Sequence, residues 1–342
     1  MKHILQAKQI EADKSEYFNA TKKIYNPIPV FPFLSEEEID AAIEELIDEK
    51  ALKIEIERLH EASKTINSTI IGTDYIICLV EWNECPELIK LLTISREWAF
   101  RNAGGGVGSI DYDEFDLRPE MKQLIIINPN YTNSKECIIG GYRYIIQNKE
   151  SYKDGPMGAH FNFSDKWKNE QWIELGRSFT NPYLQKYDKR PSIDFVLHGL
   201  GYIFAKNPDS KGYFGKVTLY NIYEQQKADE FFVTAAKEYW QQSEDVYVNP
   251  EEKIPEGTLT ESQKEWLDRD IFKGMFYLLR NDYQINMVKI MAVYNRLASL
   301  KDIYYFGAFR HHEFGDTTEV GIAIHIDDIH DTVKEKFIER YS

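Results

Sequence analysis

The sequence is poor in cysteine, with only Cys78, Cys85 and Cys137 among its 342 residues. No two of them form a Cys-x-x-Cys pair, so neither a disulfide framework nor a zinc site is indicated. Long apolar runs are absent as well: the first thirty residues hold no apolar h-region, and no run approaches the roughly 20 residues that span a bilayer. These absences predict a protein of the reducing cytosol without a transmembrane segment, and they leave peripheral contact with the inner membrane open.

Positive charge is also scarce, because 41 lysines and arginines face 56 aspartates and glutamates, for a net charge of −15. This balance disfavours binding to nucleic acid, and an anionic partner would need a local basic patch. A hydrophobic content of 43% with 14% aromatics is ample for a packed core. The length predicts an N-terminal arm and helix over residues 1–70 and a second domain over 71–342, with a polar and helical insertion at about 241–300.

Periodicity and turn residues predict a mixed α/β fold. Ser35 and Glu38 form a capping box for a helix that runs to about residue 62. Pro86 fits the first turn of a helix that ends at the glycine run 104–106. The other expected elements are strands at 75–82, 122–128, 136–147, 171–182, 215–223, 303–310 and 319–326, and helices from about 191, at 229–240, after Thr260, at 282–300 and before Tyr341. A hairpin followed by alternating units gives a mixed sheet with helices on both faces.

The stretch from Gln171 to Pro182 has the β-branched and aromatic content of a strand, yet it contains Glu174 and Arg177. A charge removed from water costs on the order of several kcal/mol unless it is paired or useful. This favours a site, and an edge strand with solvent-facing charges is the alternative. In a regular strand Glu174 and Ser178 share one face while Arg177 points to the other, so that Arg177 pairs with Glu174 only if a bulge intervenes.

Several other patterns were weighed for chemistry. Gly140 and Gly141, inside a strand, predict a bulge or a close approach of backbone or ligand, and Arg143 next to them is a second buried-charge candidate. The glycine run 104–106 follows a helix, which favours a C-cap over a phosphate loop. The acidic stretch 111–116 lacks the glycine and spacing of a calcium loop. The histidine groups at 311–312 and 325–330 lack helical spacing, so no metal site is predicted.

With these motifs in this order, the chain resembles the GNAT acyltransferase superfamily. The residues that carry the resemblance are Arg96-x3-Phe100, Asp113-x2-Asp116, Gly140–Arg143 and Trp172–Arg177. They are similar to a series found in acyl-homoserine-lactone synthases. The stretches 96–106 and 174–179 look more like the hemolysin-like branch, which includes the N-acyltransferases of ornithine-lipid and glycine-lipid synthesis. The resemblance covers residues 75–235 well and 300–326 loosely.

The resemblance implies a GNAT-like fold and the transfer of a fatty acyl group from a thioester to the amine of a small amino acid. The product is an N-acyl amino acid or an aminolipid. The catalytic candidates are Glu174, Arg143 and Ser178, with Glu174 as the base that takes a proton from the ammonium. A structural ion pair is the alternative for Glu174. Arg143 holds the amino acid's carboxylate or joins an ion pair.

Structural or substrate ion pairs are predicted for Arg177, Arg96, Asp113 and Asp116. A salt bridge from Arg177 to Asp113 or Asp116 is favoured, because Arg177 is expected to face away from Glu174.

The donor site departs from the superfamily pattern. The superfamily's pyrophosphate loop carries two glycines before the helix, whereas residues 185–190 here read Gln-Lys-Tyr-Asp-Lys-Arg. Without glycines a backbone approaches a pyrophosphate less closely, but a basic helix N-terminus suits a single phosphate. Gln185, Lys186, Lys189 and Arg190 are therefore the candidate cofactor-binding residues. The phosphopantetheine thioester of an acyl carrier protein is predicted as donor in preference to acyl-CoA.

Two further alternatives follow from these departures. The glycine run stands where lactone synthases have a tryptophan, which disfavours an S-adenosylmethionine site. A non-catalytic module of the same fold that binds an acyl carrier or a lipid is the rival to an enzyme. The lost glycines favour the module, whereas Glu174 and Arg143 favour the enzyme.

Overall fold

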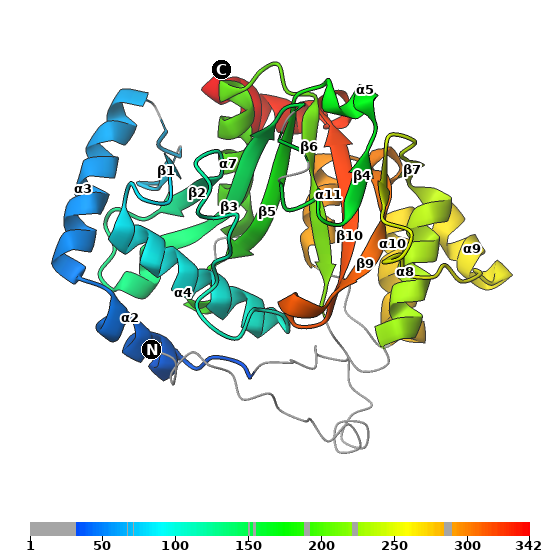
Figure 1. Ribbon diagram of the computed structural model, residues 1–342, viewed down its shortest axis with the longest axis horizontal. Helices are drawn as coiled ribbons and strands as arrows, with labels where there is room; N and C mark the ends of the chain where they lie inside the picture. The colour runs from blue at the N-terminus through cyan, green and yellow to red at the C-terminus, as the bar shows by residue number, and fades with distance from the viewer. Residues whose placement is uncertain are drawn as a thin grey trace.

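The computed structural model describes residues 32–66, 68–70, 72–149, 151–152, 155–187, 192–220, 225–283 and 289–342. Within these residues, one mixed sheet of eight strands has the order β1-β2-β3-β5-β6-β10-β9-β7 (Figure 1). The strands are β1 (Ile76–Val80), β2 (Lys122–Ile127), β3 (Ile138–Gln147), β5 (Trp172–Thr180), β6 (Gly212–Leu219), β7 (Gln241–Gln242), β9 (Tyr304–His311) and β10 (Thr317–His325). Neighbours are antiparallel except β5–β6 and β7–β9, which are parallel. The predicted mixed α/β sheet, with β3 and β5 adjacent and antiparallel, is confirmed.

Helices cover both faces of this sheet (Figure 1). On one face, the helices that pack over β1–β3 are α2 (Glu36–Leu46), α3 (Glu49–Ile66) and α4 (Pro86–Ala103). On the other face, the helices that share one core with the sheet are α7 (Ser192–Lys206), α8 (Gln225–Tyr239), α9 (Glu261–Arg269), α10 (Ile271–Asp282) and α11 (Lys289–Leu297). Short helices occur at α5 (Asp165–Lys168), α6 (Pro182–Tyr187) and α12 (Asp331–Val333). None of the described helices is long and apolar enough to cross a membrane.

Local sequence explains where the N-terminal helices begin and end. The Ser35–Glu38 capping box is present, and α4 begins at Pro86 and ends at Gly104, whose φ of 97° is left-handed. The single helix expected from residue 35 to about 62 is wrong, because Ile47 is extended and separates α2 from α3. Asp48 then accepts hydrogen bonds from the backbone N–H groups of Lys50 and Ala51, which starts the second helix.

The predicted polar insertion contributes strands as well as helices. Residues 241–262 supply β7 at the edge of the main sheet and β8 (Val246–Val248), which pairs with β4 (Phe161–Phe163). This small sheet lies over the large one, where Phe161 and Val248 share an aromatic cluster with Phe214 and Phe309. Residues 284–288 of the expected helix 282–300 lie outside the described residues.

The central strands β5 and β6 diverge about halfway along their length. Their parallel ladder joins only Ile173–Leu175 to Tyr213–Gly215, although β5 continues to Thr180 and β6 to Leu219. The divergence opens the sheet at its middle.

Candidate active site

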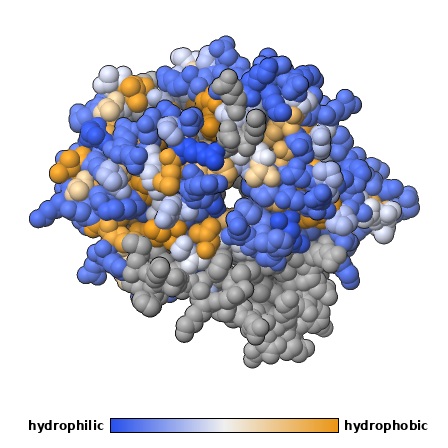
Figure 2. All heavy atoms as spheres, in the orientation of Figure 1, coloured by the Kyte–Doolittle hydropathy of each residue, from blue (hydrophilic) through white to orange (hydrophobic). Residues whose placement is uncertain are grey.

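A cavity of about 1470 Å³ occupies the gap between the diverging strands. Figure 2 shows a hollow near the centre of the molecular surface, seen in the orientation of Figure 1. The polar residues that line it include Glu174, Arg143, Arg177, Lys216, Glu319 and His311. The apolar residues that line it include Phe232 of α8, Leu279 of α10, Val293 of α11, and Ile322 and Ile324 of β10. The apolar set belongs to the core that the sheet shares with α7–α11, whereas Glu174 lies on the opposite face of the sheet, so the cavity passes through the sheet.

Glu174 lies on β5 directly opposite Ile145 of β3, and 3% of its surface is exposed. Its Oε1 accepts a hydrogen bond of 2.8 Å from the backbone N–H of Met157, and its Oε2 accepts one from the Gln147 amide. A Cβ on Gly155 would lie 2.7 Å from Oε2, so the loop before Met157 closes tightly over the carboxyl group. Burial raises the pKa of Glu174, while these hydrogen bonds act in the opposite direction.

The predicted arginines and aspartates come together as a closed ring of ion pairs, the arginine–aspartate ring. In it each arginine contacts two aspartates and each aspartate two arginines. The ring consists of Arg96 (with Asp111 at 2.6 Å and Asp116 at 3.1 Å), Arg143 (with Asp113, and Asp116 at 3.2 Å) and Arg177 (with Asp111 at 3.2 Å and Asp113 at 3.0 Å). The salt bridge predicted from Arg177 to Asp113 is confirmed, and Asp111 is a member that the sequence motif did not reveal.

Ion pairing determines the direction of the pKa shift of two aspartates of the ring, Asp113 and Asp116. Burial would raise the pKa of Asp113, but Arg143 and Arg177 outweigh it and the pKa is lowered. Arg96 and Arg143 likewise outweigh burial and lower the pKa of Asp116. One guanidinium nitrogen of Arg143, Nη1, contacts both Asp113 and Asp116, while its buried Nε has no hydrogen-bond partner. This arrangement favours the ion-pair role over the bidentate substrate role for Arg143.

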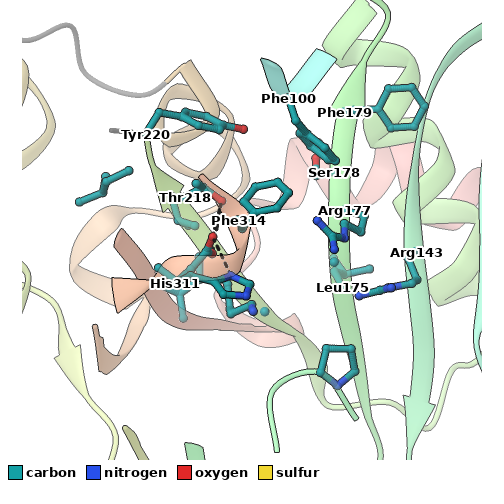
Figure 3. A pocket seen from close by; sticks show the side chains of 18 of the residues that line it. Phe100, Arg143, Leu175, Arg177, Ser178, Phe179, Thr218, Tyr220, His311 and Phe314 are labelled. Carbon is teal, nitrogen blue, oxygen red and sulfur yellow. Dashed lines mark hydrogen bonds and ion pairs between the residues drawn. The ribbon is translucent and has the colours of Figure 1, made fainter. Parts of the chain in front are cut away.

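A bulge in β5 overturns the expected facing of its side chains. Arg143 lies opposite Gly176, and Gly141 lies opposite Phe179. Between these pairs, two residues of β5, Arg177 and Ser178, lie opposite one residue of β3, Tyr142. Arg177 takes a left-handed φ of 51° at this bulge. The side chain of Arg177 therefore lies beside that of Arg143 (Figure 3) rather than pointing away from Glu174. Both arginines contact Asp113.

Ser178 moves to the other side as a result. Its hydroxyl hydrogen-bonds to Tyr142, whose side chain faces away from that of Arg143 on the same strand. The expectation that Ser178 and Glu174 share one face is therefore wrong. Ser178 still lines the cavity, but on the face of the sheet that α7–α11 cover.

The glycines serve close packing. A Cβ on Gly141 would lie 2.3 Å from the Leu124 carbonyl oxygen, and one on Gly140 would lie 2.6 Å from that of Phe179, so the predicted close backbone approach is confirmed. The glycine run 104–106 ends α4 and continues into a turn around Glu97 of that helix. Glu97 Oε1 accepts a 2.8 Å hydrogen bond from the N–H of Gly108, and Oε2 one of 3.0 Å from Val107. The anion held by this turn is the chain's own carboxylate.

Three polar residues of the other half-sheet also line the cavity: the sequence did not single out Lys216 and Glu319, and it pointed to His311 only as a possible metal ligand. Lys216 of β6 lines the cavity beyond the last β5–β6 pair. Glu319 of β10 lies opposite Thr218, which donates a 3.1 Å hydrogen bond to its Oε1. His311 Nδ1 is 3.7 Å from the same oxygen (Figure 3). Lys216 and Glu319 are each a charge within a strand, but neither lies in a recognisable motif as Glu174 does.

The predicted donor-binding residues are placed only in part. Gln185 and Lys186 belong to α6, but their side chains lie outside what the structure describes, as do residues 188–191. Among the described residues, no group of three or more histidine, cysteine, aspartate and glutamate side chains could hold a metal ion.

Comparison with known proteins gives two curated relatives. A glycine N(alpha)-acyltransferase of Bacteroides thetaiotaomicron is 31% identical over 321 residues, which cover 90% of this chain and 90% of the relative. A second, from Phocaeicola vulgatus, is 30% identical over 317 residues, covering 86% of this chain and 92% of the relative. Among solved structures, the N-acyl amino acid synthase FeeM from uncultured soil microbes matches 75% of this chain and 93% of its own, with a TM-score of 0.36 at 10% identity. No protein-family model matches the chain.

Proposed function

The chain belongs to the N-acyltransferase family of these two relatives, and from this premise we propose that it transfers a long fatty acyl group from a thioester carrier to the α-amine of a small amino acid. Glycine is the first acceptor to test, because both relatives are named for it. One observation carries the proposal. A buried carboxylate with a raised pKa lines the polar part of a cavity whose remainder, behind the sheet, is apolar.

The cavity suits both substrates of such a reaction. Its volume of about 1470 Å³ exceeds the roughly 300–1,000 Å³ of ordinary small-molecule sites, which leaves room for an acyl chain as well as an amino acid. The apolar wall of α8, α10 and α11 suits the chain. The polar groups of β5, β6 and β10 suit the amine, the carboxylate and the thioester head.

The chemistry assigned to Glu174 is general-base catalysis. Amide formation requires a neutral amine, and Glu174 takes the proton from the ammonium directly or through a water. The amine nitrogen then bonds to the thioester carbonyl carbon and the C–S bond breaks. The leaving thiolate takes up the proton that the nitrogen loses as the amide forms. The described β5–β6 ladder ends at Leu175, which supports backbone N–H groups of β5 beyond that residue as the proposed donors to the oxyanion.

Replacing Glu174 with glutamine tests this role. The Glu174→Gln variant keeps the size of the side chain and removes the base, so kcat should fall by roughly 10²–10⁴ while the KM for the acyl donor hardly changes. Steady-state assays of N-acyl glycine formation by mass spectrometry measure both. The matched variant is Glu319→Gln, another buried carboxylate that lines the cavity, which should retain far more turnover. A well-folded Glu174→Gln enzyme with near-normal kcat would show that the base is elsewhere.

The donor is proposed to be acyl carrier protein rather than acyl-CoA. The proposal rests on the sequence of residues 185–190, at the end of α6 and before α7, where glycines are missing and Lys186, Lys189 and Arg190 are clustered. Reversing these three residues to glutamate should weaken carrier binding, and the loss should shrink as salt screens the charges. Reversal of the three exposed lysines of α3 is the control. Equal use of acyl-CoA, unaffected by the reversal, contradicts the assignment.

A further inference from the structure

The cations around the cavity differ in how they are neutralised. Arg143 and Arg177 belong to the arginine–aspartate ring, and Arg310 lies 3.2 Å from Asp229. Lys216 lines the same cavity, yet none of the described carboxylates lies within 4.0 Å of its Nζ. Its Nζ lies over the ring of Phe309, 5.4 Å from the centroid. Lys216 is thus a cation in the cavity that lacks an ion-pair partner among the described residues.

The register of the strands places Lys216 beside the proposed base. Glu174 stands opposite Phe214 in the parallel ladder, and Lys216 is two residues further along β6 on the same face. On the neighbouring strand β10, Glu319 is opposite Thr218, again on this face. Lys216 therefore projects between two carboxylates at the level where β5 and β6 separate.

The ammonium group of Lys216 is poorly solvated in this position. Burial lowers its pKa, and the attraction of Glu319 and Glu174 only partly opposes this effect. An anion that entered the cavity and contacted Nζ would replace the water that the ammonium has lost. Arg143 and Arg177 already share their charge with aspartates, so the same anion would gain less from them.

We propose that Lys216 binds the carboxylate of the acceptor amino acid and so directs its α-amine toward Glu174. This inference rests on the proposed function and names the group that selects the acceptor. The amine and the carboxylate of an α-amino acid are attached to the same carbon, so a cation adjacent to the base positions both groups at once. Lys216 acts by positioning, and the proton still passes to Glu174.

The proposal predicts a preference that a structural lysine would not produce. An amine without a carboxylate, such as glycinamide, cannot use Lys216, and the half-buried ammonium of Lys216 then gains no anionic partner. The wild-type enzyme should therefore use glycine about 10- to 100-fold better than glycinamide, as measured by kcat/KM. A lysine that only balances Glu174 and Glu319 would leave the two amines equivalent.

The test compares Lys216→Met, Lys216→Arg and the control Lys211→Met, an exposed lysine just before β6. Glycine and glycinamide are assayed with the same acyl donor, and thermal melting reports folding. In Lys216→Met, KM for glycine should rise about 10- to 100-fold with a smaller change in kcat, and the preference over glycinamide should disappear. Lys216→Arg keeps a cation and should recover part of the preference, and Lys211→Met should match the wild type.

Direct binding separates this inference from the proposed function. Calorimetry with glycine alone should show binding to the wild type that Lys216→Met lacks. If the wild type acylates glycine but Lys216→Met keeps both its KM and its selectivity, Lys216 is not the anchor and the proposed function stands. If the wild type binds glycine through Lys216 but acylates no amino acid, the proposed function fails and the carboxylate site stands. A wild type that neither binds nor acylates any amino acid overturns both.

Discussion

Glu174 and Glu319 line one cavity but differ in their affinity for protons. Burial raises the pKa of Glu174, and the donors around it are a backbone N–H and an amide. The pKa of Glu319 is lowered although burial opposes this, because His311, Lys216 and Thr218 favour its charged form. A base that works near neutral pH benefits from a raised pKa. This difference supports the proposal that Glu174 takes the proton while Glu319 remains a fixed charge.

The raised pKa of Glu174 predicts the acid limb of the pH–rate profile. A base acts only when deprotonated, so kcat/KM should fall as the pH drops through the raised pKa. The midpoint should lie above 4.5, the ordinary value for glutamate. Lys216 lowers the pKa of Glu174, so Lys216→Met should move the midpoint higher still. Profiles of kcat/KM for both proteins measure this, and an acid limb at or below pH 4.5 contradicts the role of Glu174.

Single residues were predicted from the sequence where a charge interrupted an apolar strand inside a recognisable motif. Glu174, Arg143 and Arg177 met that condition. Lys216 and Glu319 did not, because Lys216 follows a glycine and Glu319 follows two threonines, where alternation reads as an ordinary half-exposed strand. These charges face Glu174 because of the order of the strands in the sheet, and no local sequence pattern carries that information.

At the scale of elements, the arginine–aspartate ring ties together parts of the chain that are distant in sequence. Arg96 comes from α4, Arg143 from β3 and Arg177 from β5, and the aspartates come from the loop before β2. Breaking one pair in a buried network leaves uncompensated charge, which costs more than the pair itself contributes. The ring therefore fixes α4 and the acidic loop against the strand that carries Glu174.

Asp116→Asn should destabilise the protein by about 3–5 kcal/mol, because Arg96 and Arg143 each lose a buried partner. Urea unfolding at neutral pH measures the change. The lowered pKa of Asp116 means that its contribution is present above the ordinary aspartate value and is lost as pH falls through the lowered one, so the deficit should shrink in acid. Glu120→Gln, at an exposed site in the same loop, should be close to neutral. Equal stability of the two variants would falsify the structural role of the ring.

Most elements could be predicted from periodicity and caps, and the exceptions have local causes. Glycines, prolines and capping boxes marked the starts of α2, α4 and α9 correctly, and the hairpin of β2 and β3 followed from its turn. The bulge at Arg177 was not predictable, because arginine rarely takes a positive φ and the ion pairs that hold it there come from another segment. The break at Ile47 was hidden by apolar spacing that continued across it.

At the scale of the whole molecule, the cavity has a polar part around Glu174 and an apolar part on the opposite face of the sheet. The apolar face is closed by α8, α10 and α11, so its depth should limit the acyl chain. Leu279→Phe, in the wall of the cavity, should shift the preferred donor toward shorter chains by about two to four carbons, since the added ring fills roughly that length. Product profiles by mass spectrometry with donors of graded length report this shift.

The matched control is Leu278→Phe, a neighbouring residue that is equally buried but does not line the cavity. It brings the same overpacking and should leave the chain-length profile unchanged. Identical profiles for the Leu279→Phe enzyme and the wild type would place the acyl chain elsewhere.

The short β5–β6 ladder also has a mechanical consequence. The strands β1, β2, β3 and β5 form one half of the sheet and β6, β10, β9 and β7 the other, and three residue pairs join them. An acyl thioester held in the gap would occupy the place of the missing rungs and bridge both halves. With the gap filled in this way, the loaded enzyme should be stiffer across this seam than the empty one. Release of the product should then make the seam compliant again.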